Sequence, residues 1–199
     1  AQNAATVLIA ASGTVSLASV SMTPPNAALL GVSNAANPLF VACGKGTYAL
    51  TLRNNCVLCG AGKYSAVVGA TSESTCQECF SGKYLHTEGN DAESDCIACA
   101  AGKFSSIAGA LSIDACQSCS TGKYSSTVGA NSVSACEDCG AGKYLTSEGN
   151  DEESDCLSCP TGKYGEDVGA SSDAVCQDCE AGKYLQSQGN DAPSDCVSC

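Results

Sequence analysis

The chain has very few of the residues that build an ordinary hydrophobic core. Its 199 residues include no tryptophan, three Phe, seven Tyr, one Met and one His. No charged residue occurs before Lys45, and no apolar run approaches the roughly 18 to 20 residues that span a bilayer. Lys and Arg number nine against 21 Asp and Glu, for a net charge of −12. Nucleic acid and anionic membrane surfaces are therefore excluded as expected partners, because both need clustered basic residues.

Cysteine, in contrast, is abundant. There are 17 cysteines in the chain, and this density in a chain with few aromatic residues is typical of a disulfide scaffold. Disulfides persist in oxidising compartments, so the composition predicts an extracellular protein, either secreted or on the cell surface. The many Ser and Thr residues are candidate sites for O-linked glycans.

The cysteines recur in pairs with a period of 20 residues. A fixed period in this range is the signature of a tandem-repeat architecture and predicts a rod. Each full repeat reads C-x2-C-x2-G-K-Y/F-x4-G-x6, as in Gly62-Lys63-Tyr64 followed by Gly69. A short repeat covers residues 43–55, seven full repeats cover 56–195, and another begins at 196–199. The pairs are Cys56/Cys59, Cys76/Cys79, Cys96/Cys99, Cys116/Cys119, Cys136/Cys139, Cys156/Cys159, Cys176/Cys179 and Cys196/Cys199.

The short first repeat bears on how the cysteines pair. It begins at Cys43, which occupies the second-cysteine position and has no first cysteine before it. This favours bonds from each second cysteine to the first cysteine of the next repeat, each worth roughly 3 kcal/mol in the chain-entropy model. The expected bridges are Cys43–Cys56, Cys59–Cys76, Cys79–Cys96, Cys99–Cys116, Cys119–Cys136, Cys139–Cys156, Cys159–Cys176 and Cys179–Cys196. Closure of each C-x2-C on itself is the alternative, and it would leave Cys43 without a partner.

Three other uses of the cysteines are open. Cys199 is left unpaired in the favoured scheme, so it awaits a partner in a further repeat, forms an intermolecular bond or stays a free thiol. The spacing C-x2-C-x16-C-x2-C also fits a zinc ribbon. A thiol-redox role for single C-x2-C pairs is the third alternative.

The repeats are of two kinds. Gly-Ala-x-Ser follows the aromatic residue in the repeats that begin at Cys56, Cys96, Cys116 and Cys156, and Gly-Asn-Asp-x-x-Ser-Asp follows it in the other three. The Gly-Asn-Asp repeats carry formal charges of −4, −6 and −3. Their carboxylates are hard ligands of the type that calcium takes, although a hydrated turn explains them equally well. The calcium candidates are Asp91, Asp95, Asp151, Asp155, Asp191 and Asp195.

The cysteine, glycine and aromatic pattern resembles the cysteine-rich repeats of the tumour-necrosis-factor-receptor and ephrin-receptor-like families over residues 43–199. This resemblance implies an extracellular, elongated, all-β stack of small disulfide-rich hairpins. It also implies a bond from the cysteine before G-x-Y to the next cysteine. The uniform 20-residue length departs from receptor modules, which vary in length and cysteine number, and this weakens any transfer of ligand binding.

Residues 1–42 form a separate, uncharged segment. Thr14-Val15-Ser16-Leu17 and Val20-Ser21-Met22-Thr23 alternate apolar and polar residues, which predicts short strands with Pro/Asn turns between them. A flexible Ala/Ser linker is the alternative, but runs such as Val7-Leu8-Ile9 are unusual in linkers. We therefore expect this segment to pack in an assembly.

The leading hypothesis is a structural extracellular protein, a subunit of a filament, appendage or sheath whose main partner is other copies of itself. The alternative is a ligand-binding or adhesive receptor-type ectodomain fragment. The sequence offers no catalytic constellation and no cofactor motif other than the calcium candidates, so we do not expect an enzyme. The lone His86 is expected on the surface.

Overall fold

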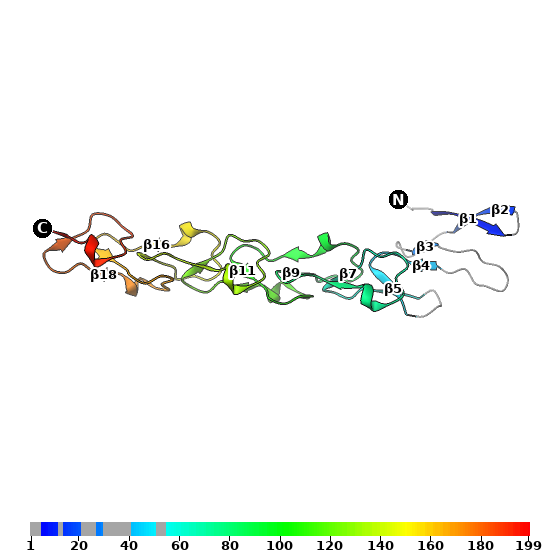
Figure 1. Cartoon of the computed structure of the whole chain (residues 1–199), viewed down its shortest axis with the longest axis horizontal. Helices are drawn as coiled ribbons and strands as arrows, with labels where there is room; N and C mark the ends of the chain where they lie inside the picture. The colour runs from blue at the N-terminus through cyan, green and yellow to red at the C-terminus, as the bar shows by residue number, and fades with distance from the viewer. Residues whose placement is uncertain (1–4, 12–13, 21–26, 30–40, 51–54) are drawn as a thin grey trace. The chain divides into compact units, whose positions relative to one another are not determined.

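The computed structural model describes residues 5–11, 14–20, 27–29, 41–50 and 55–199 (Figure 1). The described residues form an all-β structure of two-stranded antiparallel hairpins with short 3-10 turns between them. The chain divides into two compact units. One comprises Ala1–Cys79 with Leu85–Ile97, and the other comprises Phe80–Tyr84 with Ala98–Cys199.

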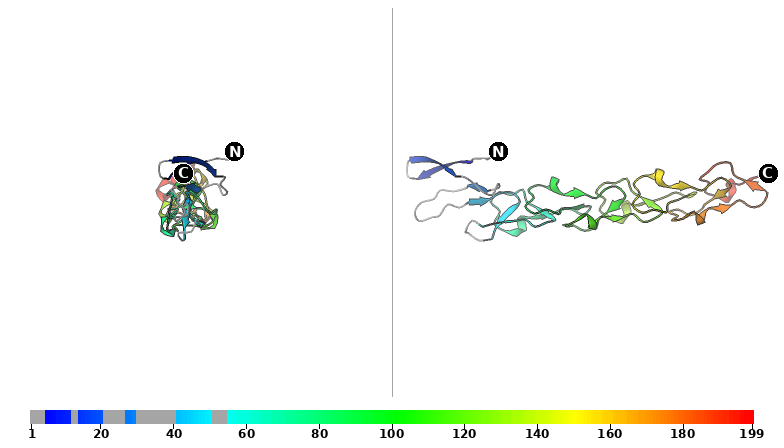
Figure 2. Two further views of the ribbon diagram at one scale, coloured as in Figure 1. Left: turned by 90° about the vertical axis from the view of Figure 1, so that its right-hand side faces the viewer. Right: turned by 180° about the vertical axis from the view of Figure 1, so that it is seen from behind.

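A long hairpin lies in the uncharged N-terminal segment (Figure 2). Strand β1 (Ala5–Ala11) pairs antiparallel with β2 (Thr14–Val20), in a register that sets Leu8 opposite Leu17. The alternation of β-branched and small residues favours extended backbone here. The first predicted strand, 14–17, continues without a break to Val20. Residues 21–23 of the second prediction, and the Pro/Asn turns, lie outside the described residues.

Two short hairpins lead into the repeats. Strand β3 (Ala27–Leu29) pairs with β4 (Val41–Cys43), and β5 (Thr47–Ala49) pairs with β6 (Cys56–Leu58). Strand β4 ends at the first cysteine of the ladder, so the N-terminal segment is joined to the repeats by backbone pairing.

Each hairpin of the repeats joins one repeat to the next. The first strand is the Lys-aromatic pair, and the second is formed by the two residues between the cysteines of the next repeat, as where Tyr124 pairs with Glu137. This register holds in β7–β8, β11–β12, β13–β14, β15–β16, β17–β18 and β19–β20. The strands are β7 (Lys63–Tyr64), β8 (Gln77–Glu78), β9 (Lys83–Tyr84), β10 (Ile97–Ala98), β11 (Lys103–Phe104), β12 (Gln117–Ser118), β13 (Lys123–Tyr124), β14 (Glu137–Asp138), β15 (Lys143–Tyr144), β16 (Leu157–Ser158), β17 (Lys163–Tyr164), β18 (Gln177–Asp178), β19 (Lys183–Tyr184) and β20 (Val197–Ser198).

A single 3-10 turn precedes the first cysteine of each pair from Cys76 onward. These turns present the backbone N–H groups that the two kinds of repeat cap differently. They are η1 (Glu73–Thr75), η2 (Glu93–Asp95), η3 (Ile113–Ala115), η4 (Val133–Ala135), η5 (Glu153–Asp155), η6 (Asp173–Val175) and η7 (Pro193–Asp195).

Backbone contacts in the second compact unit join adjacent repeats and also repeats that are two apart. Between adjacent repeats, the Gly122 N–H donates to the Leu145 carbonyl (2.8 Å), and the Gly169 N–H donates to the Cys139 carbonyl (2.8 Å). Gly122 also has φ +79°, and a Cβ there would lie 2.1 Å from the carbonyl oxygen of Gly169, two repeats further on. The same combination of a positive φ and a close approach of two backbones occurs at Gly82, Gly102 and Gly142, whereas Gly162 and Gly182 have the positive φ alone.

Candidate functional site: the disulfide ladder and its capped turns

A ladder of eight disulfides is the structural centre of the repeats. The structure contains the same eight pairs that the sequence favours, with Cα–Cα distances of 5.5 to 5.9 Å. Every second-position cysteine from Cys59 to Cys159 is at most 1 % exposed. Because the sulfur atoms are used in bridges from one repeat to the next, closure of each C-x2-C on itself and a zinc ribbon do not describe this structure.

Cys199 is the one cysteine outside the ladder. Its thiol is exposed and forms no disulfide. This agrees with the expected pairing, in which Cys43 is bonded to Cys56 and Cys199 has no partner.

Aromatic residues of three repeats each cover the disulfide that follows in the chain. Tyr48 packs with Cys59 and Cys76, which are bonded to each other. Tyr64 packs in the same way with the Cys79–Cys96 bridge, and Tyr124 with the Cys139–Cys156 bridge. The core of the repeats is therefore a series of ring-on-disulfide contacts, which explains how so few aromatic residues are enough.

The two kinds of repeat complete this core with different residues. In Gly-Asn-Asp repeats, the leucine after the tyrosine is buried against the bridge, as Leu145 is at 3 % exposure. In Gly-Ala repeats that position is Ser or Gly, and the alanine after the second glycine is buried instead, as Ala70 is against Cys59 and Cys76. The leucine side chain of the Gly-Asn-Asp repeats thus packs on the bridge in place of the alanine methyl group that the Gly-Ala repeats provide five residues later.

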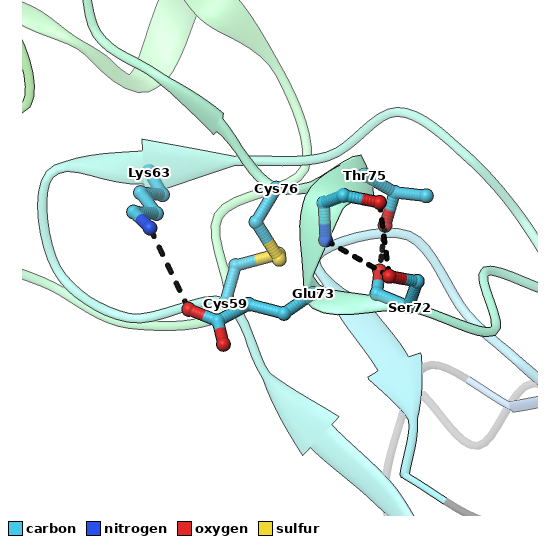
Figure 3. A network of polar contacts seen from close by, with 7 residues as sticks. Cys59, Lys63, Ser72, Glu73, Thr75 and Cys76 are labelled. Atoms are coloured by element: carbon cyan, nitrogen blue, oxygen red, sulfur yellow. Dashed lines mark hydrogen bonds and ion pairs between the residues drawn. A yellow bond between two sulfur atoms is a disulfide. The ribbon is translucent and has the colours of Figure 1, made fainter.

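Serine caps the 3-10 turn in three of the Gly-Ala repeats. The Ser72 hydroxyl accepts a hydrogen bond from the Ser74 N–H (3.2 Å), as shown beside the Cys59–Cys76 bridge in Figure 3. Ser112 and Ser132 accept equivalent bonds from the residues two positions on. A serine oxygen at this place satisfies a backbone donor that the short turn leaves without a partner.

Aspartate caps the same turn in the Gly-Asn-Asp repeats, from its other end. The Asp95 carboxylate accepts from the N–H groups of Asp91 (3.1 Å) and Ala92 (3.0 Å). Asp155 and Asp195 reach back in the same way, Asp155 to residues 151 and 152 and Asp195 to residue 192. This is the reverse half of a capping box, and it replaces the missing serine.

The asparagine of these repeats has a local role as well. The side-chain amide of Asn150 donates to the Ser147 carbonyl (2.7 Å), and Asn90 and Asn190 donate equally to residues 87 and 187. The side chain therefore closes a loop on the surface, away from the disulfide.

The six calcium candidates are divided by this geometry. Asp91, Asp151 and Asp191 are exposed, whereas Asp95, Asp155 and Asp195 are half-buried and bonded to backbone. Throughout the described ranges, no group of three or more His, Cys, Asp or Glu side chains is gathered as a ligand set. The arrangement is that of a capped turn.

Lysine side chains of the G-K-Y motif form ion pairs along the surface. Lys63 lies 3.5 Å from Glu73 across the Cys59–Cys76 bridge (Figure 3), and Lys143 lies 2.9 Å from Glu153. Lys123 pairs with Asp138, Lys163 with Asp178, and Lys183 with Glu180, whose pKa is lowered by the hydrogen bond from Lys183. Exposed pairs of this type contribute little each.

The phenol of Tyr124 lies beside an acidic side chain of the next repeat. Partial burial raises the pKa of its phenol, and the carboxylate of Glu137, 3.2 Å from the hydroxyl, raises it further. The effect belongs to the alkaline range and suggests no catalytic role.

Sequence reasoning missed the contact between every second repeat, the exchange of leucine for alanine, and the capping role of the acidic residues. The exchange of leucine for alanine leaves a signal in the sequence. In all seven full repeats, Leu after the aromatic residue occurs with Asn after the second glycine, and Ser or Gly occurs with Ala. His86 is exposed, as expected.

No protein-family model matches the chain, and a comparison with curated proteins finds no significant match. Among the described residues, no helix has the length and apolar character needed to cross a membrane.

Proposed function

We propose that the protein is a structural extracellular protein, a subunit of a filament, appendage or sheath that assembles through its N-terminal segment. The support comes from what the repeats are made of. They consist of disulfides, turns and ion pairs. Such a series sets spacing and resists unfolding.

The observation that carries the proposal is the ladder itself. Each bridge closes a loop of the main chain and joins one repeat to the next, and successive bridges from Cys43–Cys56 to Cys179–Cys196 are separated only by the two residues between paired cysteines. Backbone hydrogen bonds link the same neighbours. A chain cross-linked in this way is suited to bearing load and to persisting outside the cell, where disulfides are stable.

Electron microscopy of the purified, non-reduced protein tests this function. We expect filaments or sheets whose formation depends on residues 1–42. Single particles of uniform size at every concentration, or assemblies unchanged by deletion of residues 1–42, would contradict it.

The second candidate is a ligand-binding or adhesive ectodomain. It is favoured by the resemblance of the cysteine, glycine and aromatic pattern of residues 43–199 to tumour-necrosis-factor-receptor and ephrin-receptor-like repeats. The Cys136 repeat differs most from the others, with Glu137, Asp138, Glu152 and Glu153 all exposed. A basic ligand would be expected there, and neutralising these four residues would abolish its binding while leaving the assembly unchanged.

A further inference from the structure

The N-terminal hairpin has two long strand edges that the described structure leaves without a partner. Strands β1 and β2 pair with each other in a two-stranded sheet, and no other described strand joins them. Each is seven residues long, whereas every other described strand has two or three residues. A two-stranded hairpin alone is marginally stable in water, and exposed strand edges are templates for pairing with another chain.

The composition of the hairpin lacks the devices that usually block such edges. Residues 1–42 contain no Lys, Arg, Asp or Glu, and strands β1 and β2 contain no proline. The backbone register sets Leu8 opposite Leu17 and Val7 opposite Ala18, so apolar residues are paired along both strands. Lysine, proline or an inward-facing charge is the ordinary protection of an edge.

A second copy of this chain is the partner we consider, because charge directs contact between two copies to their hairpins. The whole net charge of −12 lies on residues 45–199, so the repeats of two copies repel one another, while the hairpins meet without electrostatic cost. The length of the edges agrees with this choice, because only another seven-residue strand pairs with them along their full length.

We propose that each edge pairs antiparallel with the same strand of another copy, β1 with β1 and β2 with β2. Both contacts are two-fold and self-complementary. In full overlap, the central residue of each strand faces itself, Leu8 opposite Leu8 and Leu17 opposite Leu17. Because the two contacts lie on opposite edges of one hairpin, their alternation generates an open series of subunits. This inference rests on the proposed function and specifies its contact.

Lysine variants of the full chain test the two edges separately. Leu8→Lys sets like charges opposite each other at the β1 contact, and Leu17→Lys does so at the β2 contact. We expect each single variant to stop at dimers in analytical ultracentrifugation and the double variant to be monomeric. Ser126→Lys, an exposed position in the repeats, adds the same charge and is expected to assemble like the unmodified chain.

Each other result has a distinct meaning. Long assemblies that persist in both single variants overturn the edge pairing and leave the proposed function standing. Monomers from either single variant overturn the arrangement of two independent edges. An unmodified chain that is monomeric at every concentration overturns both this inference and the proposed function.

Cross-linking tests the register. In a Cys199→Ser background, Leu8→Cys and Leu17→Cys are each expected to form disulfide-linked dimers, because directly opposite residues lie 4.5 to 5.5 Å apart in an antiparallel pair, within the range of a disulfide. Thr6→Cys faces Ala10 of the other copy and is the matched control, expected to give at least tenfold less dimer. A bond that forms only when Leu8→Cys and Leu17→Cys chains are mixed would overturn the pairing of like strands.

Discussion

At the scale of single residues, the repeats depend on positions where a change of one methyl group matters. Gly122 of the G-K-Y/F motif is such a position, because it combines a positive φ with a close carbonyl oxygen of Gly169, two repeats away in the same compact unit. The buried Leu or Ala beside each disulfide is another. Both follow from the lack of a conventional core, which leaves the backbone itself as part of the packing.

Gly122→Ala should be strongly destabilising. The positive φ alone costs about 1–2 kcal/mol, and the new Cβ would meet the Gly169 carbonyl at 2.1 Å. Gly162→Ala is the matched control, since Gly162 has φ +81° and no atom within 4 Å of the Cβ position. We expect the denaturant midpoint of the non-reduced protein to fall clearly more for the first variant. Equal losses would show that the close contact between repeats is unimportant.

Replacing Leu145 and Asn150 with the residues of a Gly-Ala repeat tests the role of the buried Leu or Ala beside each disulfide. Leu145→Ser removes the side chain that covers the Cys139–Cys156 bridge and should cost about 2–5 kcal/mol. Adding Asn150→Ala supplies the buried methyl group of the other kind of repeat. We expect the double variant to recover about 1 kcal/mol or more relative to the sum of the single variants, measured by a double-mutant cycle. Strict additivity would refute the compensation.

At the scale of elements, one turn is built in two chemical ways. In η1, η3 and η4, the serine before the turn accepts a hydrogen bond from a backbone N–H inside it. In η2, η5 and η7, the aspartate that ends the turn accepts a hydrogen bond from the backbone N–H of the residue before the turn. The sequence pattern Gly-Asn-Asp-x-x-Ser-Asp is compatible with a calcium loop and with a hydrated turn, because the spacing of oxygen atoms does not say which of them the backbone uses. In the structure, Asp95, Asp155 and Asp195 accept hydrogen bonds from backbone N–H groups.

Removing an aspartate cap should weaken one turn. Asp155→Ala leaves the N–H groups of residues 151 and 152 without their acceptor and should destabilise the protein by about 1 kcal/mol. Asp151→Ala, at an exposed position of the same turn, should have little effect. Thermal unfolding followed by circular dichroism measures both. A larger loss from Asp151→Ala would indicate a role for its carboxylate beyond the turn.

Calcium is expected to have no large effect on stability, because half of the candidate carboxylates already accept backbone hydrogen bonds. The melting temperature should be the same, within error, in excess calcium and in excess EDTA. A rise of several degrees with calcium, lost in Asp155→Ala, would restore the metal-site interpretation.

At the scale of the whole molecule, the cysteine spacing predicted the class of fold and the order of the bridges. The short repeat at Cys43 fixed the phase of the pairing, and the period fixed the number of repeats. Pattern alone could not reveal contacts between Gly122 and Gly169, because two glycines 47 residues apart leave no trace of their distance in the sequence. It also could not show that Tyr124 packs against the Cys139–Cys156 bridge, because Tyr124 lies nearer in sequence to the Cys119–Cys136 bridge.

Disulfide mapping of the non-reduced protein tests the central claim, that each bridge joins one repeat to the next. Proteolysis between the cysteines, followed by mass spectrometry, should yield linked peptides for pairs such as Cys119–Cys136 and Cys139–Cys156, with one alkylated thiol at Cys199. Peptides in which Cys136 is bonded to Cys139, or native protein that contains zinc and whose paired cysteines are all alkylated once the metal is removed, would contradict the account.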